Sequence, residues 1–268
     1  MGRARVPESG WCRPRPAVAI SLWLALCLSA PARAGERAEL GRGDELYAHA
    51  QLQEARQAYQ AALAADPSGF HALCRLARVE SELGEEAKGE SQRQLIASAV
   101  EHARAAAKVA PESAQGHVWL AVALGRQALK EGPKTRLALS REIKSEVDRA
   151  IAIDPGVGRA YHVRALWNRK LASLNLLERG VANTVLGGVP SGASMANAVR
   201  DLQKAIELEP GYINHHLELG RTYLMLKDRA QARRELERAS ALPTGGSALD
   251  TRYQAEAKEL LAKLGRKD

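Results

Sequence analysis

The sequence predicts an all-α chain: a right-handed superhelical array of antiparallel helix pairs that ends in a capping helix. The first observation is composition. The 268 residues include a single Phe and are rich in Ala, Leu, Arg and Glu, which favours helices over strands. The second is a recurring amphipathic stretch closed by a proline, which ends the helix before it. This pattern occurs five times, at Pro67, Pro111, Pro155, Pro210 and Pro243.

Residues 1–34 predict a secretory signal peptide that precedes the array. Four arginines between positions 3 and 15 come before the apolar run 17–30, and Ala32 and Ala34 frame a cleavage site. The run is shorter than the ~20 residues that span a bilayer, so cleavage after Ala34 is favoured over an uncleaved anchor. Together with the Ala- and Arg-rich composition, this predicts an exported protein, in a bacterial periplasm or secreted, with no membrane span in the mature chain.

Removal of the leader changes the charge and the thiol content. The leader contains five Arg and one Glu, so it carries four of the eight net positive charges. The mature chain is therefore only mildly basic, which does not indicate a nucleic-acid partner. Two of the three cysteines are also in the leader, and Cys74 alone cannot form an internal disulfide. We expect a monomer.

The spacing of the prolines indicates the type of array. Successive prolines are 44, 44, 55 and 33 residues apart, and a basic period near 34 is typical of tetratricopeptide repeats. The last pair carries the signature of small and large residues at Leu219, Gly220, Tyr223, Ala232, Leu236 and Ala239. The first pair matches it at Gly43, Leu46, Ala55, Tyr59, Ala62 and Pro67. Residues 35–268 thus predict a tetratricopeptide-like α-solenoid of about five pairs, in which Gly220 and Ala232 let two helices cross closely.

The three middle pairs exceed 34 residues, and we expect their extra length between the two helices, at a solvent-facing edge. In the second pair the acidic stretch 80–90 predicts a solvated connector, since it lacks the spaced Asp, Asn and Gly of a cation site.

In the fourth pair the tract 179–194, RGVANTVLGGVPSGAS, has the glycine spacing of a phosphate loop but neither its lysine nor a preceding strand. We interpret the tract as a connector. The first helix is expected to continue to Gly187 and Gly188, and Ser191 or Ser194 is expected to cap the second.

The stretch 248–264 lacks a partner repeat. Its apolar residues form one stripe at helical spacing: Leu249, Tyr253, Ala257, Leu260 and Leu264. We therefore expect a capping helix that covers the end of the array.

The order of several short motifs resembles the tetratricopeptide-like proteins called regulators of microtubule dynamics. The matching stretches, within residues 44–262, are ELY (45–47), RLAR (75–78), GHVWLAVALG (116–125), IKSEVDRAIAIDP (143–155), ALW (165–167), ER (178–179), VPSGAS (189–194), AVRDLQKAIELEP (198–210), LELGRTYL (217–224) and the 250–261 tail. This resemblance implies a non-enzymatic helical-repeat protein, and some animal members associate with microtubules.

Metal and catalytic sites are not predicted, and no cofactor is expected. Neighbouring His215 and His216 point about 100° apart on a helix and cannot chelate one ion. His71 and Cys74 share a helix face, but Cys74 falls at a core position, which favours a buried thiol. No triad-like arrangement has a local signature. Trp119 and Trp167, each in the middle of a first helix, are expected to fill inter-repeat junctions, with ligand lining as the alternative.

The first helices of the pairs should line a concave groove. Basic groups with an Asn suit a peptide carboxylate or an acidic segment, and the alternative is an ordinary solvated surface. The candidate groove residues are Arg159, His162, Arg169, Lys170, Asn214, Leu217, Arg221 and Met225.

These features favour a non-enzymatic, exported scaffold that binds a protein or peptide in its concave groove. If the leader is kept, the alternative is a cytosolic or membrane-tethered regulator associated with microtubules. An enzyme is the least favoured class.

Overall fold

The computed structural model describes residues 20–185, 188 and 190–265, and within these ranges it is all-helical. The helices are α1 Ile20–Ala48, α2 Leu52–Ala65, α3 Phe70–Glu86, α4 Gly89–Val109, α5 Ala114–Ala128, α6 Pro133–Ile153, α7 Gly158–Ala172, α8 Leu176–Val185, α9 Met195–Leu208, α10 Ile213–Met225, α11 Arg229–Ala241 and α12 Asp250–Gly265. None of the described helices is long and apolar enough to cross a membrane. The predicted all-α repeat array is confirmed.

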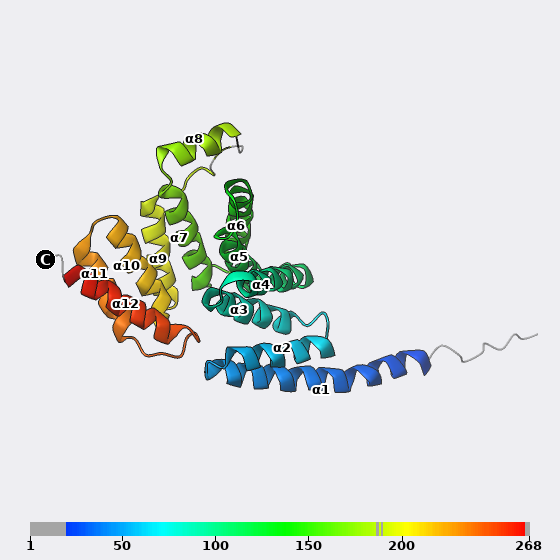
Figure 1. Cartoon of the computed structure of the whole chain (residues 1–268). Coiled ribbons are helices and arrows are strands. Elements are labelled where there is room, and N and C mark those ends of the chain that lie inside the picture. The colour runs from blue at the N-terminus through cyan, green and yellow to red at the C-terminus, as the bar shows by residue number, and fades with distance from the viewer. Residues whose placement is uncertain (1–19, 186–187, 189, 266–268) are drawn as a thin grey trace, which may run out of the picture.

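The helices pack as successive hairpins: α1 with α2, α3 with α4, α5 with α6, α7 with α9, and α10 with α11 (Figure 1). The second helix of each pair ends two residues before a proline, as α2 does at Ala65 before Pro67. The cause is local, because a proline disfavours helical geometry in the residue before it.

Small residues let the paired helices approach each other. At Gly220 of α10, an added Cβ would lie 2.8 Å from Cγ of Leu236 on α11. Ala232 and Leu236 are fully buried at the same crossing.

The last helix, α12, covers the end of the array. Its buried residues Tyr253, Ala257 and Leu264, together with Leu249 just before the helix, belong to one apolar cluster with Ile213 and Leu236 of the last pair. The predicted capping helix is thus present, and its apolar stripe is the surface that packs.

The acidic stretch 80–90 is not the solvated connector that the sequence predicts. Helix α3 continues to Glu86, and Glu80 and Glu82 are buried. Glu80 accepts hydrogen bonds from Arg56 of α2 (2.9 Å) and Ser98 of α4 (3.0 Å). Neighbouring helices therefore supply the hydrogen-bond donors that make the burial of these carboxylates possible. The extra residues of the second pair lengthen its helices and do not form a long connector.

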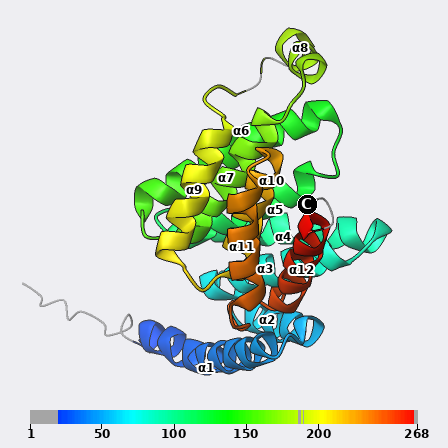
Figure 2. The same cartoon turned by 90° about the vertical axis from the view of Figure 1, so that its left-hand side faces the viewer.

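The first helix of the fourth pair also ends earlier than predicted. Helix α7 stops at Ala172, and α8 is a separate helix that stands away from the array (Figure 2). Asn175 and Glu178 exchange side chain to backbone hydrogen bonds of 2.9 Å, a capping box that starts α8. Ser194 caps α9 by accepting from the Asn197 N–H at 3.0 Å, while Gly187 lies outside the described residues.

The chain curves until its C-terminal part touches its N-terminal part (Figures 1 and 2). Arg78 of α3 donates to the Gly246 carbonyl, and the Ala248 N–H donates to the Tyr47 hydroxyl of α1 at 3.2 Å. Arg252 of α12 pairs with Glu85 of α3 at 2.9 Å. We call these contacts the seam. They close the array around its inner face.

Candidate functional site

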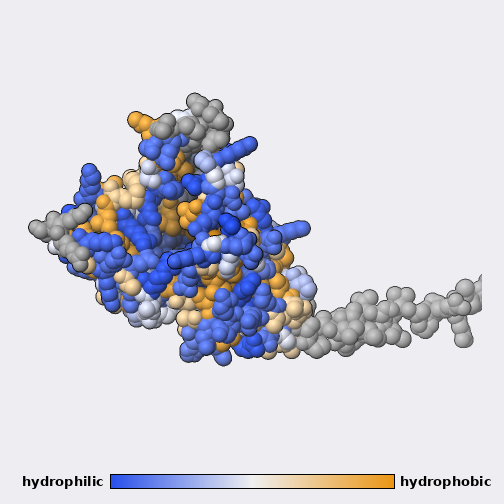
Figure 3. Space-filling model, viewed as in Figure 1, coloured by the Kyte–Doolittle hydropathy of each residue, from blue (hydrophilic) through white to orange (hydrophobic). Residues whose placement is uncertain are grey.

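The inner face of the array encloses a cavity of about 570 Å³. It lies among the first helices of four pairs, α3, α5, α7 and α10, and Ile143 of α6 and Tyr253 of α12 contribute to its wall. Figure 3 shows the hollow on the face turned to the viewer, with hydrophobic surface inside and hydrophilic side chains around it. The volume falls in the range of ~300–1,000 Å³ that is usual for ligand sites.

Seven of the eight candidate groove residues line this cavity: Arg159, His162, Arg169, Lys170, Asn214, Arg221 and Met225. The eighth, Leu217, is fully buried in the apolar cluster that joins α10 to α11 and α12. Three helical positions turn Leu217 about 60° away from Asn214, which places it beside the cavity-facing row of α10.

Sequence reasoning did not identify several other residues of the wall, among them Ser81, Glu85, Arg126 and Tyr212. Arg126 could have been identified from the sequence, because it follows Trp119 by seven residues on α5 and therefore lies on the same face of the helix. Ser81 and Glu85 were assigned to a connector.

Both tryptophans fill junctions and also line the cavity. They are buried in the central apolar cluster. The Trp167 indole N–H donates to the Ser140 carbonyl (2.8 Å) and to its hydroxyl (2.9 Å), which ties α7 to α6. Trp119 lies beside the guanidinium groups of Arg78 and Arg159, at 5.8 and 5.3 Å from the ring centre. Each tryptophan therefore both packs at a junction between helices and lines the cavity.

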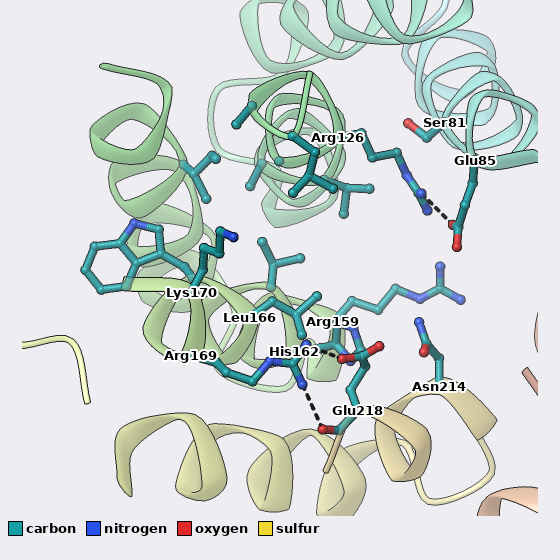
Figure 4. A pocket seen from close by; sticks show the side chains of 18 of the residues that line it. Ser81, Glu85, Arg126, Arg159, His162, Leu166, Arg169, Lys170, Asn214 and Glu218 are labelled. Atoms are coloured by element: carbon teal, nitrogen blue, oxygen red, sulfur yellow. Dashed lines mark hydrogen bonds and ion pairs between the residues drawn. The ribbon is translucent and has the colours of Figure 1, made fainter. Parts of the chain in front are cut away.

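The cavity is polar at one end and apolar along its length. Ser81, Arg126, Arg159 and Asn214 gather at one end, which we call the polar end, and Leu166 and Lys170 lie away from it (Figure 4). The wall beyond is formed by Val122, Ile143, Val163, Leu166, Trp167 and Leu171. At 1.5 Å per residue, α7 carries this wall about 18 Å from Arg159 to Leu171.

Positive charge exceeds negative charge in the cavity wall. Six cationic side chains line it, Arg126, Arg136, Arg159, Arg169, Lys170 and Arg221, against the carboxylates of Glu82, Glu85 and Glu218. Arg126 pairs with Glu85 at 2.5 Å, and Glu218 holds both Arg169 and Arg221. The excess charge favours an anionic occupant.

Arg159 is held by rings rather than by a carboxylate. Its guanidinium lies 4.6 Å from the ring centre of Tyr212, and its nearest carboxylate oxygen, on Glu209, is 3.9 Å from Nε. That separation exceeds a hydrogen bond. The backbone N–H of Arg159 donates to the other Glu209 oxygen at 3.0 Å, which fixes the start of α7.

Two buried histidines meet behind the polar end. His162 Nδ1 lies 2.9 Å from His215 Nδ1. Burial, together with the neighbouring cations, holds the pKa of His162 well below its ordinary value and lowers that of His215 as well. His216 turns instead to Glu235 and the Pro210 carbonyl. Among the described residues, no three His, Cys, Asp or Glu side chains are grouped as a metal site.

Antiparallel helix pairs with a basic period near 34 residues, and with small residues where the two helices cross, place the chain in the tetratricopeptide class of repeat proteins. Solved structures show the same fold. A tetratricopeptide protein of Thermus thermophilus, TTC0263, is similar with a TM-score of 0.63 and 20% identity, over 82% of this chain and 98% of that one. The type IV pilus biogenesis factor PilW is similar with a TM-score of 0.54 and 17% identity, over 87% and 89% of the two chains.

The chain belongs to the regulator of microtubule dynamics protein 1-3 family, whose model matches residues 40–265. Regulator of microtubule dynamics protein 3 of Rattus norvegicus is 33% identical over 72% of this chain and 41% of its own length. Protein 1 of Caenorhabditis elegans is 28% identical over 71% of this chain and 84% of its own. The resemblance that the sequence motifs indicate is confirmed, and the chain spans less than half of the protein 3 relatives.

The relatives correct the predicted location. They are animal proteins, so the prediction of a bacterial periplasmic or secreted protein is wrong. A short apolar run behind arginines is not specific to export, and in the structure residues 32–34 lie inside the continuous helix α1. The signal peptide itself stays a prediction, because residues 1–19 of the leader lie outside the described residues.

Proposed function

We propose that the protein is a non-enzymatic scaffold whose cavity binds a segment of a partner protein. The observation that carries this proposal is the wall along α7, which extends about 18 Å from Arg159 to Leu171, is apolar from Val163 onward and is bordered by cationic side chains. An extended peptide advances at most ~3.3–3.6 Å per residue, so about five residues match that length.

The proposal of a non-enzymatic role is supported by the chemistry of the buried thiol and of the cavity histidine. Cys74 is buried, and burial raises the pKa of its thiol to about 12, which leaves it un-ionised and a poor nucleophile at neutral pH. Among the described residues, the buried His162 faces another histidine rather than a carboxylate, so it has no partner of the kind that activates a general base.

Blocking the apolar wall tests the proposal. Leu166→Glu places a carboxylate in the wall and should abolish recovery of partners from a cell extract. Val109→Glu, at the exposed end of α4, is the matched control and should recover them as the unchanged protein does. Equal recovery by all three proteins would show that partners bind elsewhere.

A second candidate function is association with microtubules, supported by the names of the relatives. The test is co-sedimentation of the full chain with polymerised tubulin. Retention of the Leu166→Glu variant in the pellet would assign microtubule binding to a surface outside the cavity. Absence of the unchanged protein from the pellet would remove this candidate.

A further inference from the structure

We infer that the array opens and closes at the seam, and that a chain of ion pairs beside the cavity holds it closed. Opening would separate α12 from α3 and take Tyr253 out of the cavity wall. The inference concerns the shape of the array and does not depend on what the cavity binds.

Seven charged side chains from five helices form this chain. Arginine and glutamate alternate along it in the order Arg126 (α5), Glu85 (α3), Arg252 and Glu256 (α12), Arg221 and Glu218 (α10), and Arg169 (α7). We call this set the ion-pair chain. Figure 4 shows its two ends, the pairs Arg126–Glu85 and Arg169–Glu218.

Each carboxylate of the ion-pair chain bridges two guanidinium groups through separate oxygens. Glu85 faces Arg126 with Oε2 at 2.5 Å and Arg252 with Oε1 at 2.9 Å. Glu256 and Glu218 divide their oxygens between two arginines in the same way. A side chain that one partner already holds loses less freedom on meeting the second, so the network is stronger than isolated pairs at a surface.

One link of the ion-pair chain crosses the seam. The other links lie within one helix or join helices that pack against each other: α5 with α3, α10 with α12, and α7 with α10. The pair of Arg252 with Glu85 instead joins the last helix to the second helix pair. The closed shape therefore depends on this link more than on any other link of the chain.

The seam is mainly polar, whereas α12 is held to the last pair by apolar packing. Arg78 and Tyr47 make hydrogen bonds across the seam, and Ala248 adds a small apolar contact. Tyr253 and Ala257 of α12 are buried in the cluster of the last pair. Water replaces polar contacts far more readily than it replaces apolar packing. The helices α10, α11 and α12 should thus move as one body, and the array should open at the seam.

Dissolved ions can reach the link. Arg252 and Arg221 are each 37% exposed, and Glu85 is 21% exposed. The distance over which exposed charges interact falls from about 10 Å at 0.1 M salt to about 3 Å at 1 M. Salt should therefore weaken the ion-pair chain while it leaves the apolar clusters intact, and the open form should gain population.

Hydrogen exchange of the full chain in about 0.1 M and about 1 M sodium chloride tests the inference. Peptides that cover 245–252 should exchange about threefold faster at the higher salt, the effect expected from the loss of a partly exposed ion pair. Peptides that cover 232–239 of α11 should not change, because their buried residues belong to the apolar cluster.

Arg252→Gln removes the link to Glu85 and the pair with Glu256. Exchange over 245–252 should be about fivefold faster at low salt and should change little more at high salt. Lys263→Gln is the matched control, since it removes an exposed ion pair with Glu259 on the same helix and away from the seam. This variant should behave as the unchanged protein does.

A distance measurement separates opening of the array from local fraying. Spin labels at Glu86→Cys and Thr251→Cys occupy exposed positions on the two sides of the seam, in a chain whose Cys12 and Cys27 are replaced by Ser. Cys74 is buried and can stay. Double electron–electron resonance should show a second, longer distance that grows with salt and is already present in Arg252→Gln at low salt.

Faster exchange with a single, unchanged distance would mean that only the segment 245–252 frays, and would overturn the opening. Exchange and distances that do not respond to salt would overturn the role of the ion-pair chain. So would a salt response of the same size in Arg252→Gln. None of these results bears on recovery of partners by the Leu166→Glu variant, so the proposed function and this inference can fail separately.

Discussion

His162 of α7 and His215 of α10 meet inside the array with their Nδ1 atoms 2.9 Å apart. One proton between the two nitrogens satisfies both rings, so the pair is stable when both are neutral. Arg126, Arg159 and Arg169 surround His162, and Glu209 faces the far nitrogen of His215 at 3.3 Å. Burial outweighs that single carboxylate, the cations around His162 add to its effect, and protonation of the pair is disfavoured.

Stability should therefore fall as the pH falls. In the unfolded chain each histidine takes up a proton near pH 6.5, whereas the folded pair has lowered pKa values and stays neutral. Below about pH 6.5 the unfolded state binds more protons, and stability is lost at up to ~1.4 kcal/mol per pH unit for each site. Urea unfolding between about pH 7.5 and 5.5 measures this slope. His162→Gln should flatten it, and the exposed His49→Gln should not; an unchanged slope in His162→Gln would contradict the assignment.

Gly220→Ala should destabilise the protein. The new methyl would press on the Leu236 side chain at the crossing of α10 and α11, and overpacking of this kind costs about 1–3 kcal/mol. Gly125→Ala on α5 is the control. No atom outside its own helix turn lies within 4 Å of the added methyl, so helix propensity should stabilise this variant by about 0.5–1 kcal/mol. The melting temperatures of the two variants should shift in opposite directions. A shift in the same direction would contradict the overpacking expected at the crossing of α10 and α11.

Two histidines join proline turns to the second helix of their pairs. His117 lies 2.9 Å from the Pro111 carbonyl and 2.6 Å from Glu146, and His216 stands in the same relation to Pro210 and Glu235. His117→Ala should cost about 1–3 kcal/mol, because it removes the ring that links Glu146 to the proline turn, although Arg149 still donates to the Pro111 carbonyl at 3.0 Å. The exposed His71→Ala should be neutral within about 0.5 kcal/mol. The free energies of unfolding of both variants, measured by chemical denaturation, show whether the contact of His117 with Pro111 and Glu146 stabilises the helix pair.

Tyr47→Phe should loosen the seam and lower the overall stability by about 1–3 kcal/mol. It removes the hydroxyl that accepts from the Ala248 N–H and donates to the buried carboxylate of Glu82 at 2.7 Å, and hydrogen bonds to charged groups contribute more than neutral ones. Hydrogen exchange in peptides that cover 245–252 should become faster. Tyr161→Phe is the control, since the Tyr161 ring contacts Arg164 on α7 and not the seam. Unchanged exchange in Tyr47→Phe would show that the other contacts hold the C-terminal segment without this hydrogen bond, among them those of Arg78 with Gly246 and of Arg252 with Glu85.

The helix pairs and most of the cavity face could be predicted because their signals are local. Proline positions and apolar spacing lie within each helix, and the register of α7 and α10 followed from them, apart from Leu217. The end of α7 could also have been predicted, because Asn175 and Glu178 have the spacing of a capping box, which starts a new helix.

The burial of Glu80 could not be predicted in the same way. Its partners come from two other helices, Arg56 from α2 and Ser98 and His102 from α4, and no pattern in the sequence of α3 indicates them. The seam is a stronger case, because it joins residues about 200 positions apart, such as Tyr47 and Ala248. Such contacts depend on the accumulated curvature of the whole array.

Most helical-repeat proteins can grow by duplication of a unit, since each repeat touches only its neighbours. Here the contact of Arg252 with Glu85 links the last helix to the second pair. One further unit would carry α12 beyond the reach of α3, and the hollow would lose the wall that Tyr253 provides. The number of repeats in this chain is therefore fixed by its closure, and new specificity has to arise by substitution inside the hollow.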